Sequence, residues 1–448
     1  MTVIANCLRS EPAKRALLAV CTFLAVPAVS GLVAVRASLS FVSGRIAAAE
    51  PIAAAEPAAA EKPWANWRGP GQNGVSGDNT GPLRWSESTG IRWKTPLTGS
   101  GIASPIVFGD SVVTTTAEGA RQNELHVVCF DRYTGVARWD RRLWGTSPTL
   151  FHATKSGMAS PTPATDGKHL YAFFGTGDLF CLELDGRLRW QRSLAEEYGP
   201  FENRFGHTSS PLLDGDLLIL QCDHYGASYV LAVDKQTGEN RWKVDRPGIW
   251  HSWSSPQISD AEGHRELLVC SSEAIEAFDV RTGAPRWKVR GLQRECIPTP
   301  IVGMGRVFAV SGPKGKTFSI RPGGVGDVTD THVDWTVARG GPFVPSPILV
   351  GDQLYLVDDQ GIATCLDART GQRVWQKRLP GEYTVSPVAA GERIYFINDA
   401  GDTTVVKAFT RQFEELARNT LGEPVYSSPA LSGGRLYIRG AKHLYCVE

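Results

Sequence analysis

The sequence SPILVGDQLYLV at residues 346–357, followed by DARTGQRVW at residues 367–375, contains the unit that decides the fold. Pro347 opens an apolar run, Gly351 and Asp352 form a turn, and a second apolar run follows. Proline is tolerated at the first residue of a strand, where the ladder does not yet need an N–H donor, and glycine accepts the positive φ of a tight hairpin. The unit therefore predicts short antiparallel strands joined by tight turns.

The same unit recurs along the chain, and self-similarity with this period indicates a repeat architecture. A Ser-Pro or Thr-Pro dipeptide opens each copy, and intervals of 40 to 56 residues match one four-stranded propeller blade with its loops. The sequence therefore predicts an all-β fold, an eight-bladed β-propeller. The eight prolines are Pro105, Pro161, Pro211, Pro256, Pro300, Pro347, Pro387 and Pro429.

The second half of the unit is the motif Asp-x-x-Thr-Gly-x-x-x-Trp. Asp caps its own turn, and Gly takes the left-handed conformation that closes the hairpin. Trp falls on the outer strand, where its ring can wedge between neighbouring blades and its N–H can reach a carbonyl. We therefore interpret these residues as architectural. The complete copies contain Asp131, Gly135 and Trp139; Asp234, Gly238 and Trp242; Asp279, Gly283 and Trp287; and Asp367, Gly371 and Trp375, while blade two keeps Asp185, Gly186 and Trp190 and blade five keeps Asp334 and Trp335.

Two parts of the repeat depart from this pattern. The eighth copy ends at Glu448 without an outer strand, and residues 91–94 match an outer-strand segment with its Trp. An N-terminal strand is therefore expected to complete blade eight and close the ring, which removes exposed sheet edges. In blade seven, residues 408–419 lack the Trp and residues 412–417 favour a helix, so we expect weaker docking of this blade.

The composition excludes one class of function. Hydrophobic residues make up 42% and charged residues 21% of the 448 residues, as in soluble globular proteins. The 47 Lys and Arg residues nearly balance the 46 Asp and Glu residues. A nucleic-acid binder usually has a strong basic excess, so no nucleic-acid partner is expected.

The N-terminal region differs from the repeats. Basic residues between positions 9 and 15 precede an apolar run at residues 16–35, a pattern typical of an export signal and long enough to span a bilayer. We expect a periplasmic or extracytoplasmic protein, anchored to the inner membrane by residues 16–35 if the leader is retained. The predicted divisions are a signal peptide or membrane anchor at 1–37, an Ala/Pro/Glu-rich flexible linker at 38–62 and the propeller at 63–448.

The nine cysteines do not have the spacing of a metal site. No CxxC, CxxCH or Cys/His zinc pattern occurs in the chain. Four cysteines occupy equivalent places in the repeated strand, where Cys acts as a small buried apolar residue. We interpret them as structural and expect no metal there. These four are Cys129, Cys181, Cys365 and Cys446.

Together, the turn motif and the eight Ser-Pro-led units resemble the pyrroloquinoline-quinone (PQQ) repeat propellers over roughly residues 64–448. That group includes quinoprotein alcohol and sugar dehydrogenases and BamB, the propeller subunit of the outer-membrane β-barrel assembly machine. The segment at residues 67–71 resembles the start of many envelope proteins of this kind. The resemblance is specific for the fold and weak for activity, because the repeat residues hold blades together in both branches.

Polar residues that do not repeat gather in the loops of blades three to five. In a propeller, the loops between blades and those joining the two middle strands of a blade share one face. We therefore predict a candidate rim binding site beside the central channel; the alternative is a solvated rim whose Trp residues cover the channel. Its members are Asn203, Arg204, His207, Trp250, His251, Trp253, Arg294 and Glu295 from between-blade loops, and Asp223, His224, Glu273 and Lys314 from mid-blade loops.

The dehydrogenase branch implies a PQQ cofactor and a Ca²⁺ ion that polarises it, with an Asp as general base. Asp223, Glu273 and Asn203 are the candidate Ca²⁺ ligands. The chain lacks the adjacent cysteines of these enzymes and a haem-attachment motif, and most of its blades are compact. We therefore expect no catalytic residue, no metal and no cofactor, and PQQ with Ca²⁺ belongs only to the alternative of a quinoprotein alcohol or sugar dehydrogenase.

The preferred hypothesis is a non-enzymatic exported scaffold of the bacterial cell envelope with a BamB-like interaction role. Such a propeller presents its loops and a shallow funnel to a protein or carbohydrate partner. A second alternative is a carbohydrate-binding module, in which the rim Trp residues are stacking platforms.

Overall fold

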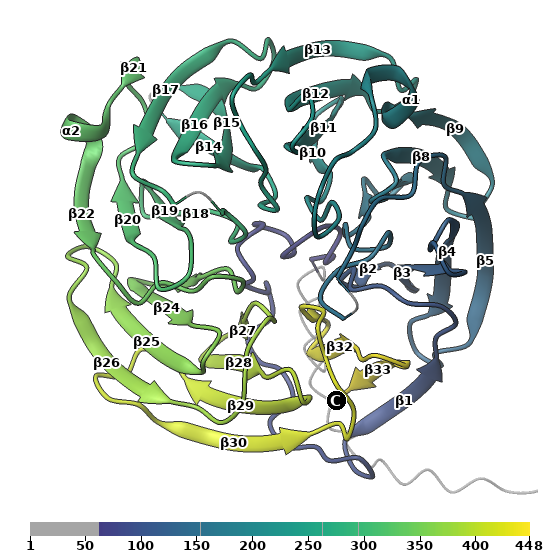
Figure 1. Ribbon diagram of the computed structural model, residues 1–448. Coiled ribbons are helices and arrows are strands. Elements are labelled where there is room, and N and C mark those ends of the chain that lie inside the picture. Colours follow the sequence, from purple (N-terminus) through teal and green to yellow (C-terminus); the bar gives the residue numbers. More distant parts are fainter. Residues whose placement is uncertain (1–61, 153, 262, 294) are drawn as a thin grey trace, which may run out of the picture. The chain divides into compact units, whose positions relative to one another are not determined.

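The structure, a computed structural model, describes residues 62–152, 154–261, 263–293 and 295–448. These residues form eight β-sheets arranged as the blades of a propeller (Figure 1). The predicted eight-bladed, all-β fold is thereby confirmed. The predicted leader and all of the linker before residue 62 lie outside the described residues, as does the apolar run at 16–35; among the described residues, neither helix is long and apolar enough to cross a membrane.

Blades 1 to 4 follow one another from the first Ser-Pro unit, each with strands in chain order from the channel outward. Blade 1 contains β2 (Ile106–Phe108), β3 (Ser111–Glu118), β4 (Glu124–Asp131) and β5 (Ala137–Trp144); blade 2 contains β6 (Ala164–Thr165), β7 (His169–Phe173), β8 (Asp178–Glu183) and β9 (Leu188–Ser193), followed by helix α1 (Leu194–Tyr198); blade 3 contains β10 (Leu212–Asp214), β11 (Leu217–Cys222), β12 (Tyr229–Asp234) and β13 (Asn240–Asp245); and blade 4 contains β14 (Gln257–Ala261), β15 (His264–Ser271), β16 (Ala274–Asp279) and β17 (Pro285–Arg290).

Blades 5 to 8 continue the ring, and the outer strand of the last blade comes from the N-terminal side. Blade 5 contains β18 (Ile301–Gly303), β19 (Arg306–Val310), β20 (Thr317–Ile320) and β22 (Val333–Val337). Between β20 and β22 the chain forms β21 (Gly326–Asp327), which pairs in parallel with β17 of blade 4, and helix α2 (Thr329–His332). Blade 6 contains β23 (Ile348–Val350), β24 (Gln353–Val357), β25 (Ile362–Asp367) and β26 (Arg373–Arg378); blade 7 contains β27 (Val388–Ala390), β28 (Arg393–Ile397), β29 (Asp402–Lys407) and β30 (Glu415–Thr420); and blade 8 contains β31 (Ala430–Ser432), β32 (Arg435–Arg439), β33 (His443–Val447) and β1 (Ile91–Pro96).

The inner strands of a blade are buried on both faces, and the outer strand is not. In blade 6, every residue of β24 after Gln353 is buried, whereas Trp375 is the only fully buried residue of β26. Neighbouring blades cover both faces of the inner strands, so these strands are short continuous apolar runs rather than alternating ones. The core of the propeller therefore lies between successive blades.

The ring closes between blades 8 and 1. β1 pairs with β33, and Trp93 lies opposite Cys446. Arg439 of blade 8 donates to the carbonyl oxygen of Thr115 in blade 1 at 2.5 Å, while Arg132 of blade 1 donates to the Tyr437 hydroxyl at 2.9 Å. The predicted closure by an N-terminal strand is thus confirmed. Arginines of blades 1 and 8 also form hydrogen bonds across the boundary between these two blades.

Five boundaries between blades use one contact, an outer-strand Trp packed on the glycine of the next blade's turn. A Cβ added to Gly371 would come within 2.7 Å of the Trp335 ring, and the Trp335 N–H donates to the Ala368 carbonyl at 3.1 Å. Only glycine accommodates both this approach and the φ of 71°. The other four pairs are Trp93 with Gly135, Trp139 with Gly186, Trp190 with Gly238 and Trp242 with Gly283.

Two motif tryptophans have different neighbours. Trp287 donates to the Glu266 carboxylate of its own blade at 2.9 Å, because blade 5 has no Asp-Thr-Gly turn to receive it. Trp375 packs edge-on against Phe413, with ring centroids 5.4 Å apart. The contact between indole and glycine therefore forms only where one blade has the outer-strand Trp and the next blade has the turn glycine.

The expected helix at residues 412–417 is wrong. Residues 415–420 form the strand β30 instead and pair with β29. The residues have good helix propensity, but an open edge of β29 offers a full ladder of hydrogen bonds, and tertiary context overrides propensity. Ala417 occupies the position of the missing Trp, and Trp85 joins the same hydrophobic cluster beside Tyr395, so an indole from outside the repeat packs at this boundary.

One repeat start is shifted. Strand β6 of blade 2 begins at Ala164, so Thr162-Pro163 takes the place that Ser-Pro takes elsewhere, two residues before the strand. The assignment of Pro161 is therefore wrong. The sequence SPTP contains two candidate dipeptides, and only the strand position separates them.

The seven described cysteines are all buried and free, as expected for structural residues. The four in equivalent positions each lie directly opposite an outer-strand Trp. The pairs are Cys129 with Trp139, Cys181 with Trp190, Cys365 with Trp375 and Cys446 with Trp93.

Candidate functional site

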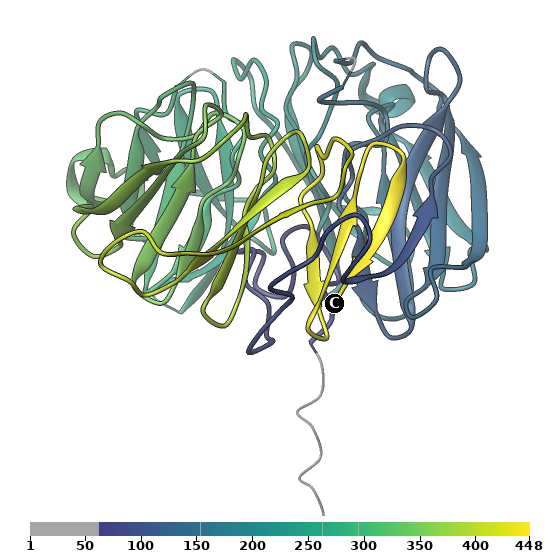
Figure 2. The same cartoon turned by 90° about the horizontal axis from the view of Figure 1, so that it is seen from below.

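The segment at residues 64–76, here called the N-terminal plug, runs through the central channel (Figures 1 and 2). It contacts blades on several sides: the N–H of Val107 donates to the Trp64 carbonyl at 2.8 Å, and the N–H of Ala389 donates to the Gly74 carbonyl at 2.9 Å. Beyond the plug the chain passes the hairpin turn of blade 8, where the Gly434 N–H donates to Asp78 at 3.2 Å. The plug therefore occupies the channel toward the end that carries the turns.

Arg68 fixes the plug to the inner strands. Its side chain is buried and donates to the Pro347 carbonyl at 2.7 Å and to the Asn73 carbonyl at 2.9 Å. Burial lowers the pKa of Arg68 to about 9. Its partners are backbone carbonyls, so Arg68 acts as a hydrogen-bond clamp for the plug.

A chain of hydrogen bonds follows the channel wall just before the inner strands. At each step, the backbone N–H of one repeat start donates to the hydroxyl of the next blade's repeat start, at 2.9 to 3.0 Å. One run passes through Ser104, Thr162, Ser210 and Ser255, and the other through Thr299, Ser346, Ser386 and Ser428. The hydroxyl of the Ser-Pro dipeptide therefore links blades, a role that the sequence did not reveal.

A cavity of about 250 Å³ lies in the channel. Trp67 of the plug lines it and donates to the Thr299 hydroxyl at 3.0 Å. The hydroxyls of the repeat starts form a polar layer of its wall, and rim loops contribute the remaining side chains. The rim side chains include His152, Lys155, Phe205, Trp253, Glu295 and Tyr426.

The charged residues of this cavity are few. Lys155 forms an ion pair with Asp399 of blade 7 at 3.1 Å, and Asp399 also accepts the Thr384 N–H at 2.8 Å. Among the described lining residues, Glu295 is the only carboxylate. The cavity is thus a hydroxyl- and aromatic-lined space rather than a charged one.

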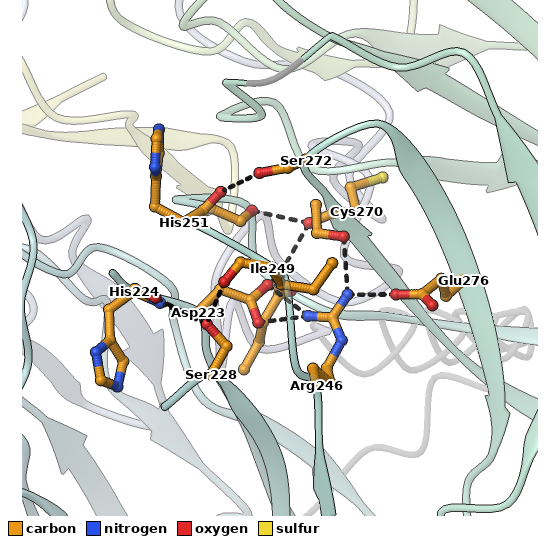
Figure 3. A network of polar contacts seen from close by, with 12 residues as sticks. Asp223, His224, Ser228, Arg246, Ile249, His251, Cys270, Ser272 and Glu276 are labelled. Atoms are coloured by element: carbon orange, nitrogen blue, oxygen red, sulfur yellow. Dashed lines mark hydrogen bonds and ion pairs between the residues drawn. The ribbon is translucent and has the colours of Figure 1, made fainter. Parts of the chain in front are cut away.

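Asp223 belongs to a buried ion-pair network (Figure 3). Both of its carboxylate oxygens pair with Arg246, whose other terminal nitrogen contacts Glu276 and the Ser271 hydroxyl, the latter at 2.8 Å. Gln221 donates to Asp223 at 2.7 Å. Burial alone would lower the pKa of Arg246, but the two carboxylates outweigh it and raise the pKa above its usual value. Asp223 is fully occupied by these partners.

His207 and His224 are packed among aromatic rings rather than exposed at the rim. The Phe201 ring lies 5.2 Å from His207 and 4.9 Å from His224, measured between centroids. Burial lowers the pKa of His207 to about 3 and that of His224 to about 4. Both imidazoles are therefore neutral at physiological pH and cannot act as cationic groups. Asn203 is also buried, and its amide donates to the Asp223 carbonyl at 3.4 Å.

The other aromatic members form a cluster of tilted and edge-on rings next to the cavity. His251 lies 4.6 Å from Trp253 and 4.7 Å from Tyr225, between ring centroids. Trp253 is buried, and its N–H donates to the Gly206 carbonyl at 2.8 Å. Trp250 remains half exposed at the edge of Tyr225, with centroids 6.5 Å apart.

The remaining predicted members do not join this cluster. Glu273 and Lys314 are exposed, each with positive φ, and neither lines the cavity. Arg204 is exposed and lies over the Phe205 ring at 5.2 Å. Glu295 lines the cavity, and Arg294 lies outside the described residues.

The sequence did not single out Arg246, Glu276, Phe205 or Tyr225. Arg246 follows an ordinary outer strand, and nothing in its neighbours signals a buried pair. The between-blade connection at residues 145–163 is long for a compact blade, and this length was the one available sign that His152 and Lys155 reach the channel.

The family of this chain is shown by its sequence. Residues 75–288 and 360–448, more than half of the chain, match the family described as "Outer membrane protein assembly factor BamB". The chain belongs to the BamB family. A curated relative, the outer membrane protein assembly factor BamB of Burkholderia pseudomallei (strain K96243), is 39% identical over 54 residues, which cover 12% of this chain and 14% of the relative.

Solved structures share the fold of this BamB-family chain. BamB from Moraxella catarrhalis aligns with a TM-score of 0.58 and 15% identity, covering 80% of this chain and 99% of that one. A europium-containing methanol dehydrogenase aligns with a TM-score of 0.64 and 13% identity, covering 85% and 90%. At these identities the likeness concerns the fold alone, so it does not separate the scaffold branch from the dehydrogenase branch.

The three residues predicted as Ca²⁺ ligands do not form one Ca²⁺ site. Ca²⁺ takes six to eight oxygen ligands. Of the three candidate ligands, Asp223 is paired with Arg246, and Glu273 is exposed and does not line the cavity. The Asn203 amide nitrogen donates to a backbone carbonyl, while its Oδ1 atom makes no hydrogen bond within the described residues. These three side chains therefore do not converge on one ion.

Proposed function

We propose that this BamB-family chain is a polypeptide-binding scaffold of the cell envelope that serves the assembly of outer-membrane proteins. The observation that carries the proposal is an exposed apolar surface on the rim loops of blades 1 to 4, here called the rim apolar surface. Four of the eleven large hydrophobic residues that are exposed among the described residues belong to it: Leu150, Phe205, Tyr225 and Trp250.

A groove of about 900 Å³ lies within this surface. Residues 147–151 from the loop after blade 1 and residues 200–204 from the loop after blade 2 line it, together with Tyr225. Exposed aromatic side chains around a groove are typical of protein-binding sites, because they offer a large contact area at a low cost in side-chain entropy. The family description, an assembly factor for outer membrane proteins, supports a polypeptide as the occupant.

Two further features support binding over catalysis. Asp223, one of the three predicted Ca²⁺ ligands, is engaged with Arg246. The indole N–H of Trp253 is bonded to Gly206 and the ring is buried, which disfavours this residue as a sugar-stacking platform.

Site-specific crosslinking tests the proposal. A photoreactive residue at Trp250 or Leu150 of the full chain, expressed in its own envelope, is expected to crosslink to an outer-membrane protein or to a subunit of the machinery that assembles it. The same residue at Val136, which is 64% exposed but lies on an Asp-Thr-Gly turn, is the matched control. Equal crosslinking at Val136, or none at the rim, would contradict the proposal.

The enzyme alternative has its own measurement. Purified full chain is titrated with PQQ in saturating Ca²⁺ and followed by Trp fluorescence and dye-linked alcohol oxidation. We expect neither stoichiometric binding nor turnover. Binding with turnover would replace the scaffold function with a dehydrogenase.

A further inference from the structure

We propose a binding site for a divalent transition-metal ion of the zinc class on blade 1, formed by His126, Glu118 and Glu124. One ligand atom from each of these three side chains lies within 4.8 Å of the others. Imidazole nitrogen and carboxylate oxygen are the ligands that Zn²⁺ takes in proteins, and water completes such a set. None of the three side chains lines the channel cavity or the groove of the rim apolar surface.

The position of the site follows from the length of the strands. β4 and β5 of blade 1 have eight residues each, whereas the matching strands of the other blades have at most six. The additional length places Glu118 opposite Glu124 and Thr116 opposite His126 in the β3–β4 ladder. All three proposed ligands therefore stand on paired strands, which hold them in place better than loops would.

His126 carries the proposal because one of its nitrogens has no hydrogen-bond partner among the described residues. The side chain is 9% exposed, and its buried Nε2 atom makes no hydrogen bond within the described residues. Nε2 lies 3.6 Å from a carboxylate oxygen of Glu124, which is too long for a hydrogen bond. Two ligands at about 2.1 Å from a tetrahedral Zn²⁺ lie roughly 3.4 Å apart, so the spacing is that of two ligands sharing an ion.

The other nitrogen of His126 is already oriented. Nδ1 lies 2.9 Å from the Asp140 carboxylate. A metal-bound histidine typically donates its second ring N–H to a carboxylate, which sets the tautomer and directs the free nitrogen at the ion. Asp140 is therefore a positioning residue, and the lone pair of Nε2 is directed at the two glutamates.

Arg142 competes for the same carboxylate. Its guanidinium pairs with Glu124 and lies 5.0 Å from the Trp144 ring. The Arg142 side chain is 57% exposed, so it can move into solvent when an ion takes the carboxylate. Removing this competing cation is expected to strengthen metal binding, an effect that a purely structural ion pair would not produce.

Calorimetric titration with Zn²⁺ tests the site. The full chain without a polyhistidine tag is treated with chelator, dialysed and titrated with Zn²⁺ alone. We expect one ion per chain and an upward shift of the melting temperature, since an ion that binds only the folded state stabilises it. His126→Gln and Glu118→Gln are expected to weaken binding at least tenfold, Asp140→Asn about tenfold, and Arg142→Gln to tighten it.

The matched control is His169→Gln on blade 2. His169 is 13% exposed and lies 3.9 Å from Asp166 and 3.8 Å from Glu183, but Asp166 is paired with Lys235 and Glu183 with Arg189. This variant is expected to bind Zn²⁺ as the parent does. If His126→Gln does not fold, Glu118→Gln at the end of its strand decides the question. No stoichiometric binding by the parent, or undiminished binding by Glu118→Gln, would overturn the proposal and leave His126 as a structural residue bonded to Asp140.

Discussion

The two ends of this propeller are built on different principles. At the end that carries the Asp-Thr-Gly turns, one contact is used five times, an indole on a glycine with its N–H on a carbonyl. Among the described residues at the end that carries the rim loops, no indole-on-glycine contact recurs. There Asp223 pairs with Arg246, His207 packs against Phe201, and Lys155 reaches Asp399 of blade 7.

The difference shows where such a fold can change its function. The turn residues repeat because every boundary between blades poses the same packing problem. The rim residues do not repeat, because loops carried by a rigid ring can differ without disturbing it. The rim polar residues are divided in exposure: Asp223, His207 and His224 are buried, whereas Arg204, Glu273 and Lys314 are exposed. The following predictions test whether the two ends differ in this way.

The largest effect is expected from Asp223→Ala at the rim end. The substitution leaves Arg246 buried with only the partly exposed Glu276 as a counter-charge, and breaking a buried pair from one side costs about 4 kcal/mol of unfolding free energy. Urea unfolding at pH 7 measures it. Adding Arg246→Met is expected to recover most of the loss. A cost no larger than that of Asp216→Ala, a variant of an exposed Asp, would contradict the buried-pair interpretation.

The next effect is expected from Gly371→Ala at the turn end. The new Cβ would meet the Trp335 ring at 2.7 Å and would require a φ of 71°, so we expect a loss of about 3 kcal/mol. Gly215→Ala is the control, since its φ is 59° but nothing lies within 4 Å of the added Cβ. It isolates the backbone strain, about 1 kcal/mol. Equal losses in both variants would mean that the Trp contact is not tight.

A smaller effect is expected from pH at the rim end. The folded-state pKa values of His207, about 3, and His224, about 4, lie below the unfolded value near 6.5. Their stabilisation is therefore complete above pH 6.5 and is lost as the pH falls toward those values. Between pH 7 and 5.5 the two together should cost about 2.5 kcal/mol of unfolding free energy. Chemical unfolding at both pH values should show a weaker pH dependence for the His207→Gln, His224→Gln double variant than for the parent.

The smallest effect on stability is expected from Trp250→Ala. The side chain is half exposed, so its removal should change the unfolding free energy by no more than about 0.5 kcal/mol. The same variant should weaken the rim crosslink described above when the photoreactive residue is placed at Leu150. A large loss of stability with unchanged crosslinking would assign Trp250 to the architecture of the rim rather than to binding.

Local sequence was a reliable guide wherever the repeat carried the information. The strand order, the eight blades and the closure by residues 91–96 follow from motif spacing, because each blade must bury the same faces against its neighbours. It was a poor guide where the repeat broke down. Residues 415–420 have the propensity of a helix, and Pro161 has the sequence of a repeat start, yet pairing with neighbouring strands decided both positions against the local signal.

The candidate site shows the same division. The sequence placed His207, His224, His251 and Asp223 near one another, since propeller topology brings those loops together. It did not reveal that Arg246 saturates Asp223 or that Phe201 encloses two imidazoles. Burial and pairing depend on partners 23 to 30 residues away in neighbouring strands, and no local pattern records them.

By itself, the sequence determined the number of blades, the strand that closes the ring and the glycines on which indoles pack, because these are periodic and each copy repeats the same steric demand. Only the tertiary structure decided that a segment before the first blade fills the channel, that the rim histidines are neutral and buried, and that an unpartnered His126 nitrogen faces two glutamates. Each of these features is a contact between residues distant in sequence that occurs once in the molecule. Because such a contact is not repeated from blade to blade, it produces no periodic pattern in the sequence.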